Sequence, residues 1–195
     1  IKARRFAHVV SIRASGSLDF SSALVYRPPR LNETPQDAGS SHMDITLTEC
    51  TDADWETLTA FMAAFNEEDG HRYGPENEAA LRELMANPMH GRALMIRRDG
   101  EPAGYAVLCY GFAVEFHGRD GFLDEIYVAP AHRGFGVAAH ALEDLVEIAR
   151  ADGLKALHLE VMDGNEGATR LYRRAGWEFR QARTMTRYLT RDSDR

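Results

Sequence analysis

Short stretches in which apolar and polar residues alternate recur between residues 44 and 189, a pattern typical of half-buried strands. Strands are predicted at residues 44–49, 93–96, 103–110, 122–128 and 156–161, with one or two more between 177 and 189. The pair Asp99-Gly100 predicts a tight turn between the second and third strands. Residues 117–120 are predicted to form a loop, and Pro130 ends the strand that follows it.

Four other stretches carry apolar residues three or four positions apart, the spacing of one helix face. They cover residues 52–65, 76–85, 134–150 and 168–175. The third is the most regular, with one apolar stripe made by Ala138, Ala141, Leu142, Leu145 and Ala149. The order is strand, two helices, three strands, helix, strand, helix and one or two final strands. This order predicts a mixed α/β fold without an internal repeat.

The first 42 residues are a different kind of sequence, rich in serine, arginine and proline. Residues 6–12 have the pattern of a short strand, but no neighbouring stretch supplies a convincing partner. Residues 39–42, ahead of Met43, resemble a vector junction. Residues 1–42 are therefore interpreted as a vector-derived leader or a natural N-terminal extension, and residues 43–195 as the functional domain.

The composition narrows the class of protein. Of 195 residues, 44% are hydrophobic, enough for a sizeable core, and the formal net charge is −7. This acidic balance argues against nucleic acid as a partner and is compatible with a cationic one. No apolar run is long enough for a transmembrane helix, so no membrane partner is expected. Cys50 and Cys109 form no C-x-x-C pair, which indicates a reduced, cytoplasmic setting.

Residues 122–138 lead from a strand through a glycine-containing turn into a helix. This arrangement points backbone N–H groups at one place, where the positive end of the helix dipole also acts. Gly134 and Gly136 let a phosphate approach the main chain, and Arg133 adds charge at the rim. The alternative is that the glycines only form a tight turn. Residues 134–139 also match the dinucleotide pattern G-x-G-x-x-A, but too little chain follows for a two-half Rossmann sheet.

Two motifs together resemble a known family. Residues 133–138 match R/Q-x-x-G-x-G/A, the pyrophosphate-binding pattern of the GNAT superfamily of acyl-CoA-dependent N-acyltransferases. Farther along, the family's downstream signature is matched by Asn165, Ala168, Leu171-Tyr172 and Gly176-Trp177. The resemblance spans residues 44–190 and includes the element order. It implies a mixed, mostly antiparallel central sheet flanked by helices, whose fourth and fifth strands splay to admit CoA.

The resemblance also implies how acetyl-CoA binds as co-substrate. The backbone amides of residues 134–138 would hold the pyrophosphate, and the main chain of residues 126–128 would pair with the pantetheine arm. Asn165 would bond the pantetheine, with capping of the following helix as its alternative role. The cofactor-binding residues expected on this basis are Ile126, Tyr127, Val128, Arg133, Gly134, Phe135, Gly136, Val137, Ala138 and Asn165.

Two catalytic residues are expected. The resemblance implies that Tyr172 is the general acid that protonates the departing thiolate; the alternative is a core aromatic. Glu125 is the candidate base because it precedes the CoA-pairing stretch and, in a regular strand, shares parity with Leu123 and Tyr127. Asp124 would face the other way unless a bulge exchanges them, and Glu160 is the reserve. For each carboxylate a purely structural role is the alternative.

The acceptor is poorly specified. The resemblance implies that residues 67–73, predicted as a connecting loop with an acidic start, and residues 112–120 line the acceptor site. The resemblance implies acetyl transfer to a primary amine, such as a small cationic amine like a polyamine or aminoglycoside, or a protein lysine. The alternative is a non-catalytic acyl-CoA-binding or regulatory domain. A homodimer through the C-terminal strands is implied by resemblance alone. No H-E-x-x-H pattern or Cys/His cluster is present, so no metal is expected.

Overall fold

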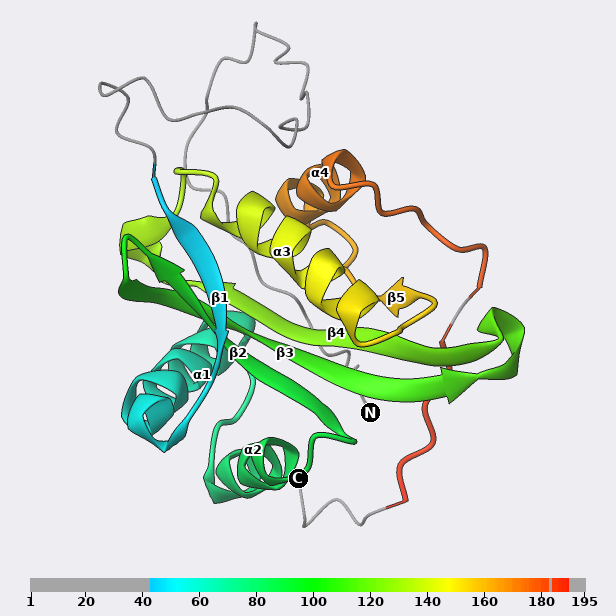
Figure 1. Ribbon diagram of the computed structural model, residues 1–195, viewed down its shortest axis with the longest axis horizontal. Helices are drawn as coiled ribbons and strands as arrows, with labels where there is room; N and C mark the ends of the chain where they lie inside the picture. The colour runs from blue at the N-terminus through cyan, green and yellow to red at the C-terminus, as the bar shows by residue number, and fades with distance from the viewer. Residues whose placement is uncertain (1–42, 183, 190–195) are drawn as a thin grey trace, which may run out of the picture.

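A single five-stranded sheet forms the centre of the protein (Figure 1). The computed structural model describes residues 43–182 and 184–189, so the expectations for residues 1–42 lie outside the described part. The strands follow one another across the sheet in chain order and are β1 Ile45–Glu49, β2 Gly91–Arg98, β3 Glu101–Ala113, β4 Gly118–Val128 and β5 Leu157–His158. The first four pair antiparallel and β5 pairs parallel to β4, which confirms the mixed, mostly antiparallel sheet.

Helices cover both faces of the sheet, as Figure 1 shows. Helices α1 (Trp55–Asp69) and α2 (Pro75–Ala86) pack on one face, and α3 (Val137–Ala151) and α4 (Glu166–Arg174) on the other. Single 3-10 turns, at Asp52–Asp54, Val114–Phe116 and Pro130–His132, join some of these elements. Among the described residues, no helix is both long and apolar enough to cross a membrane.

Each face of the sheet has its own hydrophobic cluster. On the α3/α4 face, Leu123, Ile126 and Val128 of β4 pack with the apolar stripe of α3. On the α1/α2 face, Tyr105 and Tyr127 pack with Met62 and Phe65 of α1. The strands therefore bury side chains on both sides, as expected for a sheet between two helical layers.

A β-bulge interrupts β4 at Asp124. Leu123 pairs with Leu108 and Glu125 with Val107, so Asp124 is the extra residue between two consecutive partners. Leu123 and Ile126 consequently share a face although they are three positions apart. The predicted shared parity of Glu125 and Leu123 is wrong, because the bulge moves the residues after it to the opposite face.

Three predicted elements differ from the structure. The strand predicted at 156–161 is reduced to Leu157–His158, and the loop predicted at 117–120 falls mostly inside β4. The strands predicted between 177 and 189 are wrong for the described residues of that stretch, which include no strand. An alternating pattern forms a strand only where a neighbour supplies main-chain partners, and none lies beside this stretch in the described chain.

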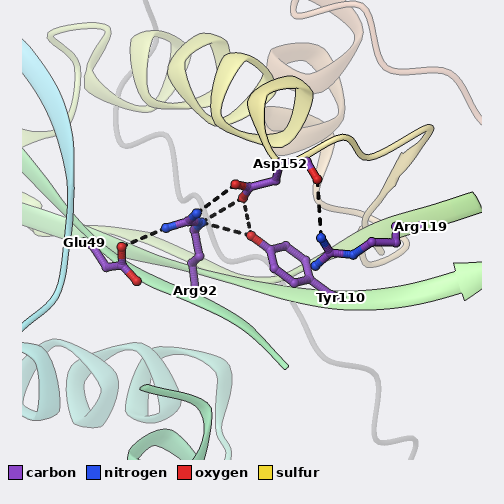
Figure 2. Close-up of polar contacts among 5 residues, drawn as sticks. All are labelled: Glu49, Arg92, Tyr110, Arg119 and Asp152. Atoms are coloured by element: carbon purple, nitrogen blue, oxygen red, sulfur yellow. Dashed lines mark hydrogen bonds and ion pairs between the residues drawn. The ribbon is translucent and has the colours of Figure 1, made fainter. Parts of the chain in front are cut away.

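Arg92 lies at the centre of a polar network that joins the sheet to the end of α3 (Figure 2). Its guanidinium donates to Asp152 at 2.7 and 2.8 Å, to Glu49 at 2.7 Å and to the Tyr110 hydroxyl at 3.0 Å. Tyr110 also donates to Asp152, and Arg119 donates to the Asp152 carbonyl at 3.4 Å. These contacts connect β1, β2, β3 and β4 with the residue that caps α3.

Candidate functional site

The predicted phosphate turn lies directly ahead of α3. Gly134 and Gly136 have φ of +83° and +79°, the left-handed region in which a side chain is strained, and Gly136 is the N-cap of α3. Within the described chain, no acceptor is found for the N–H groups of residues 134–138. The helix begins with a set of unpaired donors at the positive end of its dipole.

The space in front of this turn fits an anionic group. A Cβ built at Gly134 would meet no atom within 4 Å, and one at Gly136 would meet only His140, at 3.9 Å. The first turn of α3 carries no acidic residue. The donor set and the open space therefore suit a phosphate, and the expected contact residues Phe135, Val137 and Ala138 lie on the same turn and first helical residues.

Arg133, however, is directed away from the turn. Its guanidinium contacts both carboxylate oxygens of Glu68 at 2.9 Å, and its Nε donates to the carbonyl of Val128 at 2.6 Å. Glu68 lies in the last turn of α1, on the opposite side from α3. In this structure, positive potential at the turn comes from the main-chain amides rather than from the side chain of Arg133.

The edge of β4 beside the turn has no described strand next to it, although the carbonyl of Val128 at its end accepts the bond from Arg133. Its parallel pairing with β5 ends at Phe122 and His158, just before the bulge. Because a bulge bends its strand, the bend at Asp124 helps to part β4 from the chain after β5. Residues 126–128, predicted to pair with pantetheine, therefore have β3 on one side and no described strand on the other.

Glu125 lies on the α1/α2 face beside the aromatic cluster. The hydroxyl of fully buried Tyr105 donates to its Oε2 at 2.8 Å. Asp124, the extra residue of the bulge, precedes it in β4, and both carboxylates help to raise the pKa of Cys109, which burial chiefly brings to about 12. Because of the bulge, Glu125 is on the face of Tyr105 and Tyr127 rather than on that of Leu123. Glu160, the reserve candidate, lies in the chain beyond β5.

Tyr172 is buried in the cluster on the other face. It packs against Trp177, with ring centroids 6.2 Å apart, and its hydroxyl is buried without a hydrogen-bond partner among the described residues. Burial raises the pKa of Tyr172 above its ordinary value, so the phenol is neutral and carries a proton. Asn165 is the N-cap of α4, and its side chain accepts a hydrogen bond from the Ala168 amide at 3.1 Å.

The acceptor side has a different backbone from the one predicted. Glu67, Glu68 and Asp69 are the last residues of α1, so only residues 70–74 form the connection to α2. Tyr73 in this connection donates to Glu78 at 3.3 Å. Residues 112–120 are the ends of β3 and β4 around a 3-10 turn. No group of metal-ligating side chains occurs in the described part of the chain.

Two contributors to the site were not singled out from the sequence. Tyr105 was expected only as part of a strand, and Glu68 only as one of three acidic residues. Each contacts a residue far along the chain: Tyr105 donates a hydrogen bond to Glu125, and Glu68 accepts one from Arg133. The alternation of β3 could have indicated that Tyr105 and Val107 share a face, but the bulge conceals which residues of β4 face them.

The family assignment follows from comparison of the whole domain. Residues 54–177 match the model of the Acetyltransferase (GNAT) family, which is more than half of the chain. The chain belongs to the GNAT acetyltransferase family. The expected resemblance is thereby confirmed.

Two similar proteins carry names that state their substrates. The thialysine N-epsilon-acetyltransferase of Bos taurus is 34% identical over 88 residues, 43% of this chain and 52% of that protein. The L-methionine sulfoximine/L-methionine sulfone acetyltransferase of Pseudomonas paraeruginosa is 32% identical over 136 residues, 65% of this chain and 78% of that protein. This chain thus spans about half the length of the bovine relative. An integron cassette protein from a salt-marsh metagenome has a similar structure, with a TM-score of 0.66, 29% identity and coverage of 74% of this chain and 91% of that one.

Proposed function

We propose that this protein is an N-acetyltransferase that transfers the acetyl group of acetyl-CoA to a primary amine, by direct attack in a ternary complex. Bound acetyl-CoA supplies an activated thioester. The N–H groups of residues 134–138 bind its pyrophosphate, and the open edge at residues 126–128 pairs with the pantetheine arm. Asn165 caps α4 through its Oδ1, which leaves its amide NH₂ available to the pantetheine.

Glu125 and Tyr172 move the protons of this reaction. Glu125, on the α1/α2 face, accepts a proton from the ammonium form of the acceptor, directly or through water, so that nitrogen has a lone pair for attack. As the carbon–nitrogen bond forms and the carbon–sulfur bond breaks, Tyr172 protonates the departing sulfur. The nitrogen loses its second proton, by way of water, to the Tyr172 phenolate, and the proton held by Glu125 passes to solvent, so that the products are a neutral amide and a thiol. Glu125 and Tyr172 lie on opposite faces of the sheet, so acceptor and leaving group would approach the open edge of β4 from different sides.

The observation that carries an enzymatic role, over binding alone, is the hydroxyl of Tyr172. A buried hydroxyl without a partner costs free energy, and phenylalanine would fill the same space without that cost. Packing therefore does not explain the hydroxyl, whereas proton donation to a bound sulfur does.

The acceptor class is proposed to be a cationic amine. Glu125 lies on the α1/α2 face with Asp124 next to it in the chain, and the chain carries a formal net charge of −7. The named substrates of the relatives, thialysine and L-methionine sulfoximine, lend support to a small amine. Release of free thiol from acetyl-CoA over a panel of amines would identify the acceptor; the panel includes amino acids, polyamines, aminoglycosides and lysine peptides.

The Tyr172→Phe variant tests the acid role with the best amine of that panel. We expect turnover to fall about 100-fold, within the range for general acid catalysis, while the Kd for acetyl-CoA changes less than about twofold. Because the variant removes no described hydrogen bond, its melting temperature should equal or exceed that of the wild type. Tyr188→Phe, in the exposed C-terminal stretch, is the matched control. Unchanged turnover would remove the acid assignment, and acetyl-CoA binding without thiol release for any amine would favour a binding domain.

A further inference from the structure

Tyr105 is the residue of β3 that contacts the proposed base. It is fully buried, and its hydroxyl donates to Glu125 Oε2 at 2.8 Å. In the ladder, Tyr105 pairs with Tyr127 and Val107 with Glu125, so Tyr105 and Glu125 are diagonal neighbours on one face. The bulge at Asp124 sets this face for Glu125, and the contact therefore depends on an irregularity of the strand.

Packing fixes the ring of Tyr105. Phe65 of α1 meets it edge-on, at a centroid distance of 6.3 Å and an interplanar angle of 88°, and Tyr127 lies 6.1 Å away. A buried ring held from both the helix and the neighbouring strand keeps its hydroxyl in one place. The Tyr105 hydroxyl is thus a preorganised donor to the Glu125 carboxylate.

Among the described residues, Tyr105 and Cys109 of β3 and Tyr73 in the connection before α2 interact electrostatically with Glu125. Asp124 precedes Glu125 on β4, and Tyr73 also donates a hydrogen bond to Glu78. Burial is the main cause that raises the pKa of each of these groups, to about 12 for Tyr73 and Cys109 and well above 10.0 for Tyr105. The second cause is Glu78 for Tyr73, Asp124 for Cys109 and Glu125 for Tyr105. At neutral pH the phenols and the thiol are neutral.

We propose that Tyr105 is a positioning residue for the reaction: its hydroxyl holds the Glu125 carboxylate in the ionised form and in the orientation that accepts the proton of the amine. This inference rests on the proposed function, since it assigns a role to Glu125 as base. A hydrogen bond donated to a carboxylate stabilises its charged form, and the buried hydroxyl of Tyr105 supplies that bond to Glu125.

The Tyr105→Phe variant tests this role, because phenylalanine keeps the packing and removes only the hydroxyl. Loss of a donor to a charged group should move the acidic limb of kcat/KM to higher pH by about one unit. The 13C resonance of the Glu125 carboxyl, assigned by its loss in Glu125→Gln, should titrate at correspondingly higher pH. Tyr110→Phe is the control, because it removes a hydroxyl–carboxylate bond from the same strand, at Asp152. In Tyr110→Phe, the acidic limb of kcat/KM and the titration of the Glu125 resonance should match those of the wild type.

The outcomes separate the two proposals. If Tyr105→Phe and the wild type have the same acidic limb of kcat/KM and the same titration of the Glu125 13C resonance, the role of Tyr105 is overturned. If the Glu125→Gln variant retains the acidic limb of kcat/KM, Glu125 is not the base. The Glu125 13C resonance, compared between wild type and Tyr105→Phe, would still report whether Tyr105 stabilises the Glu125 charge. Thermal melting of Tyr105→Phe and Tyr110→Phe measures any loss of folding, which would lower the amplitude of the profile without moving its midpoint.

Discussion

At the scale of single residues, Asn165 has two roles that a suitable substitution separates. Its Oδ1 caps α4 by accepting from the Ala168 amide, and its NH₂ group is the part proposed to meet the pantetheine. Aspartate keeps an acceptor at the cap and has no NH₂ donor, whereas alanine removes both.

We expect Asn165→Ala to lower the free energy of unfolding by about 1 kcal/mol, the typical value of an N-cap. Asn165→Asp should unfold with a free energy within about 0.3 kcal/mol of the wild-type value, because the cap is kept. Its affinity for acetyl-CoA should fall several-fold, because the NH₂ donor is lost. Urea denaturation and titration calorimetry measure the two effects. If Asn165→Asp binds acetyl-CoA as tightly as the wild type, Asn165 is a cap alone.

Local sequence patterns predicted which residues form the turn and the helix cap, but not which distant residues pair with one another. The glycines of the turn and the capping asparagine were predictable because their roles depend on the few residues around them. The pairing of Arg133 with Glu68 was not, because 65 positions separate them and the motif indicates only the charge of Arg133. The face of Glu125 was hidden by one extra residue, since parity arguments assume a regular strand.

At the scale of elements, the same contrast holds. Helix α3 and the β2–β3 hairpin were predicted because a helical stripe and an Asp-Gly turn are local signals. The sheet and its antiparallel character agree with the family pattern. The stretch after Trp177 has the alternation of a strand, yet its described residues form none, because pairing requires a neighbour that local pattern does not reveal.

The turn before α3 offers an element-scale prediction. Gly136→Asp places a negative charge where the pyrophosphate would bind, so acetyl-CoA affinity should fall at least about 100-fold. Gly153→Asp is the matched control, since Gly153 also has a left-handed φ, +78°, and open space around its Cβ position, but follows the other end of α3. Its affinity should match that of the wild type. Normal binding by Gly136→Asp, measured by calorimetry, would remove the turn from the site.

At the scale of the whole molecule, the Arg92 network joins four strands to the C-terminal end of α3 (Figure 2). The N-terminal end of that helix forms the phosphate turn. The network thus fixes one end of an element whose other end belongs to the proposed site. Hydrogen bonds from Arg92, and then from Tyr110, hold the pKa of Asp152 below its ordinary value of 3.8.

Asp152→Asn should lower the free energy of unfolding by about 2 kcal/mol at neutral pH, as expected for a hydrogen-bonded charge pair. Because the folded pKa of Asp152 is depressed, its stabilising effect is complete above the unfolded value and is lost as pH falls through the folded value. The difference between wild type and variant should therefore shrink below about pH 4. Urea denaturation from pH 7 to pH 3 measures it.

Glu166→Gln is the control for this series, because Glu166 pairs with Arg170 on the exposed surface of α4. Such exposed pairs contribute little, so the variant should unfold as the wild type does at neutral pH. A constant difference between Asp152→Asn and wild type over the whole pH range would show that the charge of Asp152 does not stabilise the fold.

The uncovered edge of β4 at residues 123–128 also bears on solubility. A strand edge that no described strand covers can join the edge of another protein molecule as readily as it joins a ligand. Pantetheine bound along that edge would block such association, so aggregation should decline as acetyl-CoA concentration rises, by mass action. The proposed co-substrate would then also protect the protein against self-association, and a preparation stripped of acetyl-CoA would be the one most prone to precipitate.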